Sequence, residues 1–202
     1  MTDFVGFHAW DPRIAADEFP AVADALASRE GLELLRAKHG GAEREYGAEG
    51  ARVAFFHDAE KTPPQIWAYI DRDSFRRLGQ PVVARVFKGM SEATRPVLAR
   101  SFSPQFHGVI ESREASAGLQ FIDWFQYFPP AMVARIGLEA LERVPIAQRE
   151  MLPDGACVLW LPGSPLDGLE GRTAAAEALG VTLRPLIGRN PESGEPFVMP
   201  WH

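Results

Sequence analysis

The stretch from residue 121 to residue 163, FIDWFQYFPPAMVARIGLEALERVPIAQREMLPDGACVLWLPG, decides the fold of this chain. Six of its first eight residues are large and apolar or aromatic, which predicts a strand. Pro129 and Pro130 end that strand, because proline has no N–H to give to a sheet. Apolar residues then recur at spacings of three and four, which predicts a helix over residues 131–144.

The second apolar run of this stretch, residues 156–161, predicts another strand. It is almost wholly apolar, as strands covered on both faces usually are. We expect the strand at residues 120–128 and the strand at residues 156–161 to belong to one sheet. The intervening helix should pack on that sheet, because its apolar side needs an apolar surface and these two strands offer the nearest one.

The rest of the chain predicts further elements on either side of this unit. Residues 81–88 favour a helix, although their β-branched and aromatic residues also suit a strand. The other expected strands cover residues 4–10, 52–56, 65–70 and 181–187, and the other expected helices cover residues 17–29, 32–38 and 173–179. We also expect a flexible glycine-rich loop over residues 40–50, an exposed turn over residues 57–64, and residues 111–128 as the hairpin partner of the preceding extended segment, residues 102–110. The expected helix caps are Asp17, Asp73 and Ser74.

Composition places the chain among ordinary globular proteins. It has 202 residues, of which 46% are hydrophobic and 24% charged, which fits a single α+β domain over residues 1–202 with a mixed β-sheet and helices packed on it. The start carries no secretory signal pattern and no apolar run approaches the roughly 20 residues that cross a bilayer. We therefore expect a cytoplasmic protein with no membrane partner.

The net charge and the single cysteine argue against two further features, a nucleic-acid-binding surface and an internal disulfide. The formal net charge of −6 argues against a nucleic-acid-binding surface, which normally needs a basic face, and is compatible with a basic protein partner. Cys157 is the only cysteine, so no internal disulfide can form, and its place in an apolar strand predicts a buried structural thiol.

Motif chemistry is absent from the sequence. The five histidines show no metal-ligand spacing, and only distant residues such as His8, His57 and Asp58 could combine into a metal site. The segment after the second strand, LPGSPL, lacks the second glycine of a nucleophile elbow, and no phosphate-binding loop occurs. His57 and Asp58 are the best local acid/base candidates, and a solvated pair at a turn is the alternative. We expect no cofactor, and the absence of motifs favours a binding or inhibitory protein over an enzyme.

Residues 119–183 resemble a known family. The run DWFQYFPP, the helix AMVARIG, the strand LPDGACVLWL and the segment EGRTAAAEALGV are similar to immunity proteins of bacterial polymorphic-toxin and type VI secretion systems, and in particular to the immunity protein 52 family. Trp124, Tyr127 and Phe128 match the aromatic pattern of that family, and Gly155 matches its glycine. These are framework residues, so the resemblance carries over no catalytic group.

The resemblance implies an α+β inhibitor that binds and neutralises a cognate toxin, often a nuclease, by occluding its active site. An acidic inhibitor would be steered electrostatically towards a basic nucleic-acid groove. The partner-binding candidates are acids on loops: Asp58, Glu60, Asp167 and Glu170. Two other readings stay open, namely a small cytoplasmic enzyme with a site near His57 and Asp58, and a purely structural subunit.

Overall fold

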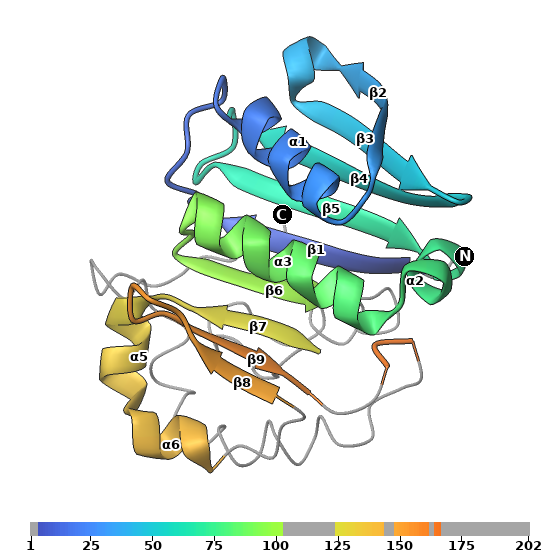
Figure 1. Cartoon of the computed structure of the whole chain (residues 1–202). Helices are drawn as coiled ribbons and strands as arrows, with labels where there is room; N and C mark the ends of the chain where they lie inside the picture. Colours follow the sequence, from blue (N-terminus) through green and yellow to red (C-terminus); the bar gives the residue numbers. More distant parts are fainter. Residues whose placement is uncertain (1–3, 103–123, 144–147, 162–163, 167–202) are drawn as a thin grey trace, which may run out of the picture. The chain divides into compact units, whose positions relative to one another are not determined.

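The computed structural model describes residues 4–102, 124–143, 148–161 and 164–166. The chain divides into two compact units, residues 1–103 and 104–202 (Figure 1). Helices and strands occur in both, which confirms the α+β class. Every strand pair with a described register is antiparallel, whereas the sequence predicts a mixed sheet. The expectation of a single domain over residues 1–202 stays a prediction.

The first unit contains an antiparallel sheet in the strand order β2-β3-β4-β5-β1-β6. Its strands are β1 (Phe4–Trp10), β2 (Glu33–Lys38), β3 (Glu43–Ala48), β4 (Ala51–Asp58), β5 (Gln65–Asp71) and β6 (Leu98–Phe102). Its helices are α1 (Phe19–Arg29), the short 3-10 turn η1 (His39–Gly41), α2 (Arg72–Leu78) and α3 (Gln80–Thr94).

The alternation of side chains along these strands gives the sheet two different faces. Figure 1 shows α1 and α3 lying across one of them, which we call the helical face. Phe7 of β1 contacts Phe87 of α3 there, with ring centroids 5.1 Å apart. The opposite face, which we call the aromatic face, carries these rings from neighbouring strands: Phe4, His8, Trp10, Phe56, Trp67, Tyr69 and Phe102.

Gly6 allows close packing on the aromatic face. It pairs with Phe102 of the neighbouring strand β6, and a Cβ at Gly6 would lie 2.3 Å from the Phe102 ring. Any larger residue at position 6 would therefore have to displace an aromatic side chain that is 4% exposed.

A polar triad ties α1 to the sheet. The Arg44 guanidinium of β3 donates hydrogen bonds to Asp24 of α1 and to the Tyr46 hydroxyl, at 2.5 and 2.8 Å. Tyr46 also donates to Asp24 at 2.8 Å. Burial alone would raise the pKa of Asp24, but the hydrogen bonds from Arg44 and Tyr46 outweigh it and lower that pKa. The triad thus supplies a buried arginine with the carboxylate that its charge requires.

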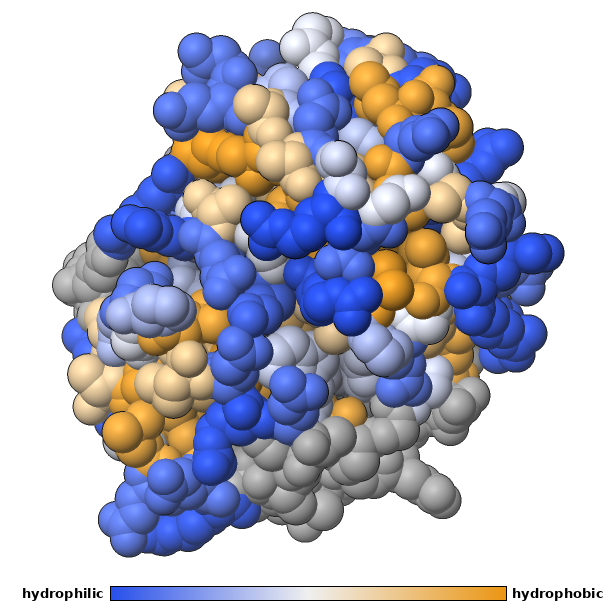
Figure 2. All heavy atoms as spheres, in the orientation of Figure 1, coloured by the Kyte–Doolittle hydropathy of each residue, from blue (hydrophilic) through white to orange (hydrophobic). Residues whose placement is uncertain are grey.

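Residues 32–50 differ most from the prediction. The expected helix over residues 32–38 is strand β2, and the expected flexible loop over residues 40–50 contains η1 and strand β3. All six residues of β2 are exposed, including Leu34 at 47% and Leu35 at 54%, and Figure 2 shows an apolar patch where β2 lies. A register shift between Leu34 and Arg36 also interrupts the alternation that would identify a strand.

Several other predictions for the first unit are confirmed. β1 has the predicted bounds, β4 and β5 extend the predicted strands, and α3 shows that residues 81–88 are helical. The predicted N-cap residues of the helices are wrong. Asp71, not Asp73 or Ser74, caps α2 by accepting a 2.9 Å hydrogen bond from the Ser74 N–H, and Asp17 does not cap α1, whose N-cap residue is Glu18.

The second unit contains strands β7 (Phe125–Phe128), β8 (Gln148–Met151) and β9 (Cys157–Trp160) and helices α5 (Pro130–Ile136) and α6 (Leu138–Glu142). β7 pairs with β9, which confirms that the two apolar strands share a sheet. β8, on the other side of β9, was not predicted, because its four residues are polar or exposed and give no apolar signal.

The predicted helix over residues 131–144 is two helices. Gly137 has a φ of 82°, in the left-handed region that glycine favours, and it separates α5 from α6. Met132, Val133, Ile136 and Leu141 are buried, so the predicted apolar side is confirmed, and its packing on the sheet stays a prediction. The predicted hairpin between residues 102–110 and residues 111–128 and the elements over residues 173–179 and 181–187 lie partly or wholly outside the described residues.

The buried side of α5 can be tested by truncation. Ile136 is 5% exposed, so Ile136→Ala should lower the free energy of unfolding by about 2–5 kcal/mol. Leu138, two residues further along, is 53% exposed, and Leu138→Ala should cost less than about 0.5 kcal/mol. Urea denaturation of both variants checks this. Equal losses of unfolding free energy in the two variants would contradict the burial of this side of α5.

Candidate partner-binding pocket

A hollow of about 720 Å³ opens at one end of the sheet of the first unit. The end of β4 and the middle of β5 form one side of it, and η1, the start of β3, the turn after β4 and the segment before α1 form the rest. We call it the acidic–aromatic pocket. Its lining residues are Ala16, His39, Ala42, Glu43, Phe56, His57, Asp58, Ala59, Glu60, Trp67 and Tyr69.

Strand geometry supplies the aromatic wall of this pocket. Trp67 and Tyr69 are two residues apart on β5 and therefore project to the same side of the sheet, as does Phe56, which pairs with Trp67. The Trp67 and Tyr69 rings are parallel, with centroids 6.3 Å apart, and Tyr69 meets Phe56 edge-on at 5.5 Å. His8 stacks on Trp67 at 3.3 Å and fixes the indole from the neighbouring strand. All three wall residues are half-buried, so part of each side chain remains accessible.

Two of the three acids that line the pocket have no compensating partner among the residues that the structure describes. Asp58 ends β4 and Glu60 lies in the turn that follows. Within the described part of the chain, neither carboxylate accepts a hydrogen bond or forms an ion pair. The third acid, Glu43, differs from both because Arg36 and Lys38 each lie 3.5 Å from it and His39 lies 3.8 Å from it.

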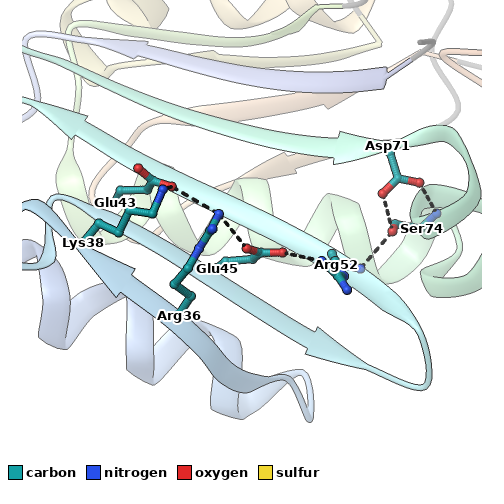
Figure 3. A network of polar contacts seen from close by, with 7 residues as sticks. All are labelled: Arg36, Lys38, Glu43, Glu45, Arg52, Asp71 and Ser74. Carbon is teal, nitrogen blue, oxygen red and sulfur yellow. Dashed lines mark hydrogen bonds and ion pairs between the residues drawn. The ribbon is translucent and has the colours of Figure 1, made fainter.

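Glu45, an acid just outside the pocket, also forms ion pairs. Figure 3 looks onto the aromatic face, with the helices behind the sheet, and shows a row of alternating charges across β2, β3 and β4. Glu45 lies 3.1 Å from both Arg36 and Arg52, and the Arg52 N–H donates to the Ser74 hydroxyl at 2.8 Å. Among the acids that line the pocket, those without a described partner are therefore Asp58 and Glu60.

His57 and Asp58 do not form an acid–base pair. As consecutive strand residues, they leave opposite faces of the sheet. The His57 ring lies on the helical face, 5.2 Å from the Phe19 ring of α1, and the side chain is 7% exposed. Burial lowers the pKa of His57, and the Asp58 charge offsets this only in part. The predicted exposed turn over residues 57–64 is thus wrong at its start, because His57 and Asp58 belong to β4.

The lowered pKa of His57 predicts a loss of stability in mild acid. Because the folded-state pKa lies below the unfolded value of about 6.5, the unfolded chain binds more protons as the pH falls through that value, and the free energy of unfolding decreases. The urea midpoint should be lower at about pH 5 than at about pH 7.5. His57→Gln should reduce that difference. An unchanged difference in His57→Gln would contradict the assignment.

The structure brings together half of the predicted binding residues. Asp58 and Glu60 both line the pocket, whereas Asp167 and Glu170 lie outside the described residues. The sequence analysis did not single out Glu43, Trp67 or Tyr69. Alternation within QIWAYI could have shown that Trp67 and Tyr69 share a face, but not that this face lacks α1 and α3.

Two other predictions concern groups away from the pocket. Cys157 is fully buried, and burial raises the pKa of its thiol to about 11, so this thiol remains protonated at neutral pH. Trp124, Tyr127 and Trp160 are buried in the second unit, as predicted for core residues.

Among the described residues, no three His, Cys, Asp or Glu side chains form a group that could hold a metal ion, and none of the described helices is long and apolar enough to cross a membrane.

Comparison with known proteins gives a structural likeness only. No family model matches the chain, and no curated protein matches it. Among solved structures, the chain is similar to Pseudomonas aeruginosa T6SS protein PA0821, with a TM-score of 0.53 and 11% sequence identity. The likeness covers 98% of this chain and 79% of that protein. At this identity it supports a shared fold.

Proposed function

We propose that this protein is an immunity-type inhibitor that binds a cognate bacterial toxin and occludes its active site. The observation that carries the proposal is the acidic–aromatic pocket. Asp58 and Glu60 place negative charge beside accessible aromatic rings, and no described residue neutralises either carboxylate. Unpaired carboxylates beside accessible aromatic rings are suited to a partner surface that offers both positive charge and apolar contact.

Two further observations support this function. Residues 119–183 resemble the immunity protein 52 family, and the fold is similar to that of a protein named as a T6SS protein. The net charge of −6 would accelerate association with a basic partner. Nucleases are the toxins that the resemblance implies, and their substrate grooves are basic because they hold phosphates.

The proposed mechanism is occlusion. The pocket lies at a sheet end that is formed by turns as well as strands, so its acids can reach into a groove on another protein. An acid that replaces a phosphate in such a groove forms charge-assisted hydrogen bonds with the basic residues that hold the substrate. The toxin then cannot bind its substrate, and the inhibitor needs no catalytic group of its own.

A charge reversal at the pocket tests this proposal. The double variant Asp58→Lys with Glu60→Lys should weaken binding to the cognate toxin, identified by pull-down from the native host, by about tenfold or more, because each lysine would face a basic surface. The melting temperature should change little, since neither acid has a described partner to lose. Calorimetric titration and a growth-protection assay against that toxin measure the two consequences.

The matched control reverses two exposed acids of α6. Glu139→Lys with Glu142→Lys changes the net charge by the same amount, so any general loss of steering affects both double variants equally. Weakening in the pocket variant alone supports binding at the pocket. Full affinity in the pocket variant, or no protection of cells by the unchanged protein, would contradict the proposal.

The second pair of predicted acids has its own test. Asp167→Lys with Glu170→Lys should weaken toxin binding by about tenfold or more, with a nearly unchanged melting temperature, if these two acids belong to the same binding surface. Comparison with the Asp58 and Glu60 variant shows which pair contributes more to binding. If affinity survives the change at Asp167 and Glu170, these two acids are not part of the surface.

A further inference from the structure

We propose that the acidic–aromatic pocket receives a single arginine side chain of the partner, with the guanidinium between the aromatic wall and the carboxylates of Asp58 and Glu60. This inference rests on the proposed function and adds to it the chemistry of the group that is recognised. It also explains why carboxylates and aromatic rings line the same pocket, although the fold does not require the two to lie together.

The carboxylates require a cation. Asp58 and Glu60 both line a hollow of about 720 Å³, a size within the range of roughly 300–1,000 Å³ that is usual for pockets that enclose a ligand group. Two like charges at one pocket repel each other, and the repulsion grows as a partner excludes water. A bound cation removes that repulsion. Glu43 does not compete for it, since Arg36, Lys38 and His39 already surround that carboxylate.

The aromatic wall favours a planar cation. The Trp67 and Tyr69 rings lie within 5° of parallel, with centroids 6.3 Å apart, so the faces of both rings have the same orientation towards a planar group. A guanidinium stacks on such a surface and at the same time directs its N–H groups at carboxylates in the plane of the group. A lysine ammonium gains from the carboxylates but cannot stack in this way.

The same chain shows a guanidinium in a similar environment. Arg44 lies over the Tyr46 ring, with its central carbon 5.9 Å from the ring centroid, while it donates to the Asp24 carboxylate. Ring, carboxylate and guanidinium are all supplied within the first unit at that position. At the acidic–aromatic pocket, rings and carboxylates are present, and the guanidinium would come from the partner.

The test uses a small probe in place of the toxin. The full chain, labelled with ¹⁵N, is titrated with N-acetylarginine N-methylamide, and the indole N–H signal of Trp67 is followed by NMR and assigned with Trp67→Phe. N-acetylcitrulline N-methylamide is the matched control, because it has nearly the same shape and no charge. We expect saturable shifts with arginine in the millimolar range, and at least about tenfold weaker binding with citrulline.

Two variants separate recognition from folding. Asp58→Asn with Glu60→Gln keeps the size of both side chains and removes both charges, and it should weaken arginine binding by about fivefold or more. The control variant Glu139→Gln with Glu142→Gln should bind as the unchanged protein does. The dispersion of the NMR spectrum shows in each case whether the chain is folded.

The outcomes distinguish the inference from the proposed function. Equal shifts with arginine and citrulline, shifts that do not involve Trp67, or tighter binding of N-acetyllysine N-methylamide than of the arginine probe would overturn the arginine assignment, even if the protein protects cells against the toxin. Charge-dependent arginine binding without protection would instead contradict the proposed function. Arginine binding that is lost in the Asp58 and Glu60 variant, together with protection by the unchanged protein, supports both.

Discussion

The register of β5 between β4 and β1 is the constraint on which the rest of the first unit depends. It pairs Trp67 with Phe56 on one side and with His8 on the other, so three ring systems from three strands meet on one face. The residues between them, such as Ile66 and Ala68, then face α1 and α3 and are fully buried. A slip of one residue would exchange the two sets of β5 side chains, so that Ile66 and Ala68 would leave the core and Trp67 and Tyr69 would face α1 and α3. The same register therefore determines the stability of the unit and the composition of the pocket.

Sequence patterns predicted the elements that are buried on at least one face. β1, β4, β5 and α3 have clear apolar periodicity, and the strands now seen as β7 and β9 were predicted from uninterrupted apolar runs. Patterns failed where an element is exposed. β2 has no buried residue, and β3 is rich in charge and glycine because its outward side chains form ion pairs instead of a core. The helix over residues 131–144 was predicted as continuous because a single glycine does not always end a helix, and only the backbone at Gly137 shows that it does here.

The candidate site could be predicted only in part for a related reason. Asp58 and Glu60 were recognisable as acids near a turn, and the structure does place both at the pocket. The aromatic wall depends on which face of the sheet α1 and α3 cover, and that is decided by long-range packing. The ion pairs of Glu43 and Glu45 likewise depend on cations from β2, a strand that the sequence did not reveal. Local sequence thus identified charges, whereas the distinction between compensated and uncompensated charges needed the fold.

The central claim is that a partner binds at the acidic–aromatic pocket, and hydrogen exchange measured by mass spectrometry tests it most directly. The chain would be compared with and without the cognate toxin, identified by pull-down from the native host. We expect slower exchange in peptides that cover residues 39–42 and 59–62, which lie outside the paired strand registers, with little change in β1 and β5, whose amides are already hydrogen-bonded in the sheet. Protection confined to other parts of the chain, with these two segments unchanged, would contradict binding at the pocket.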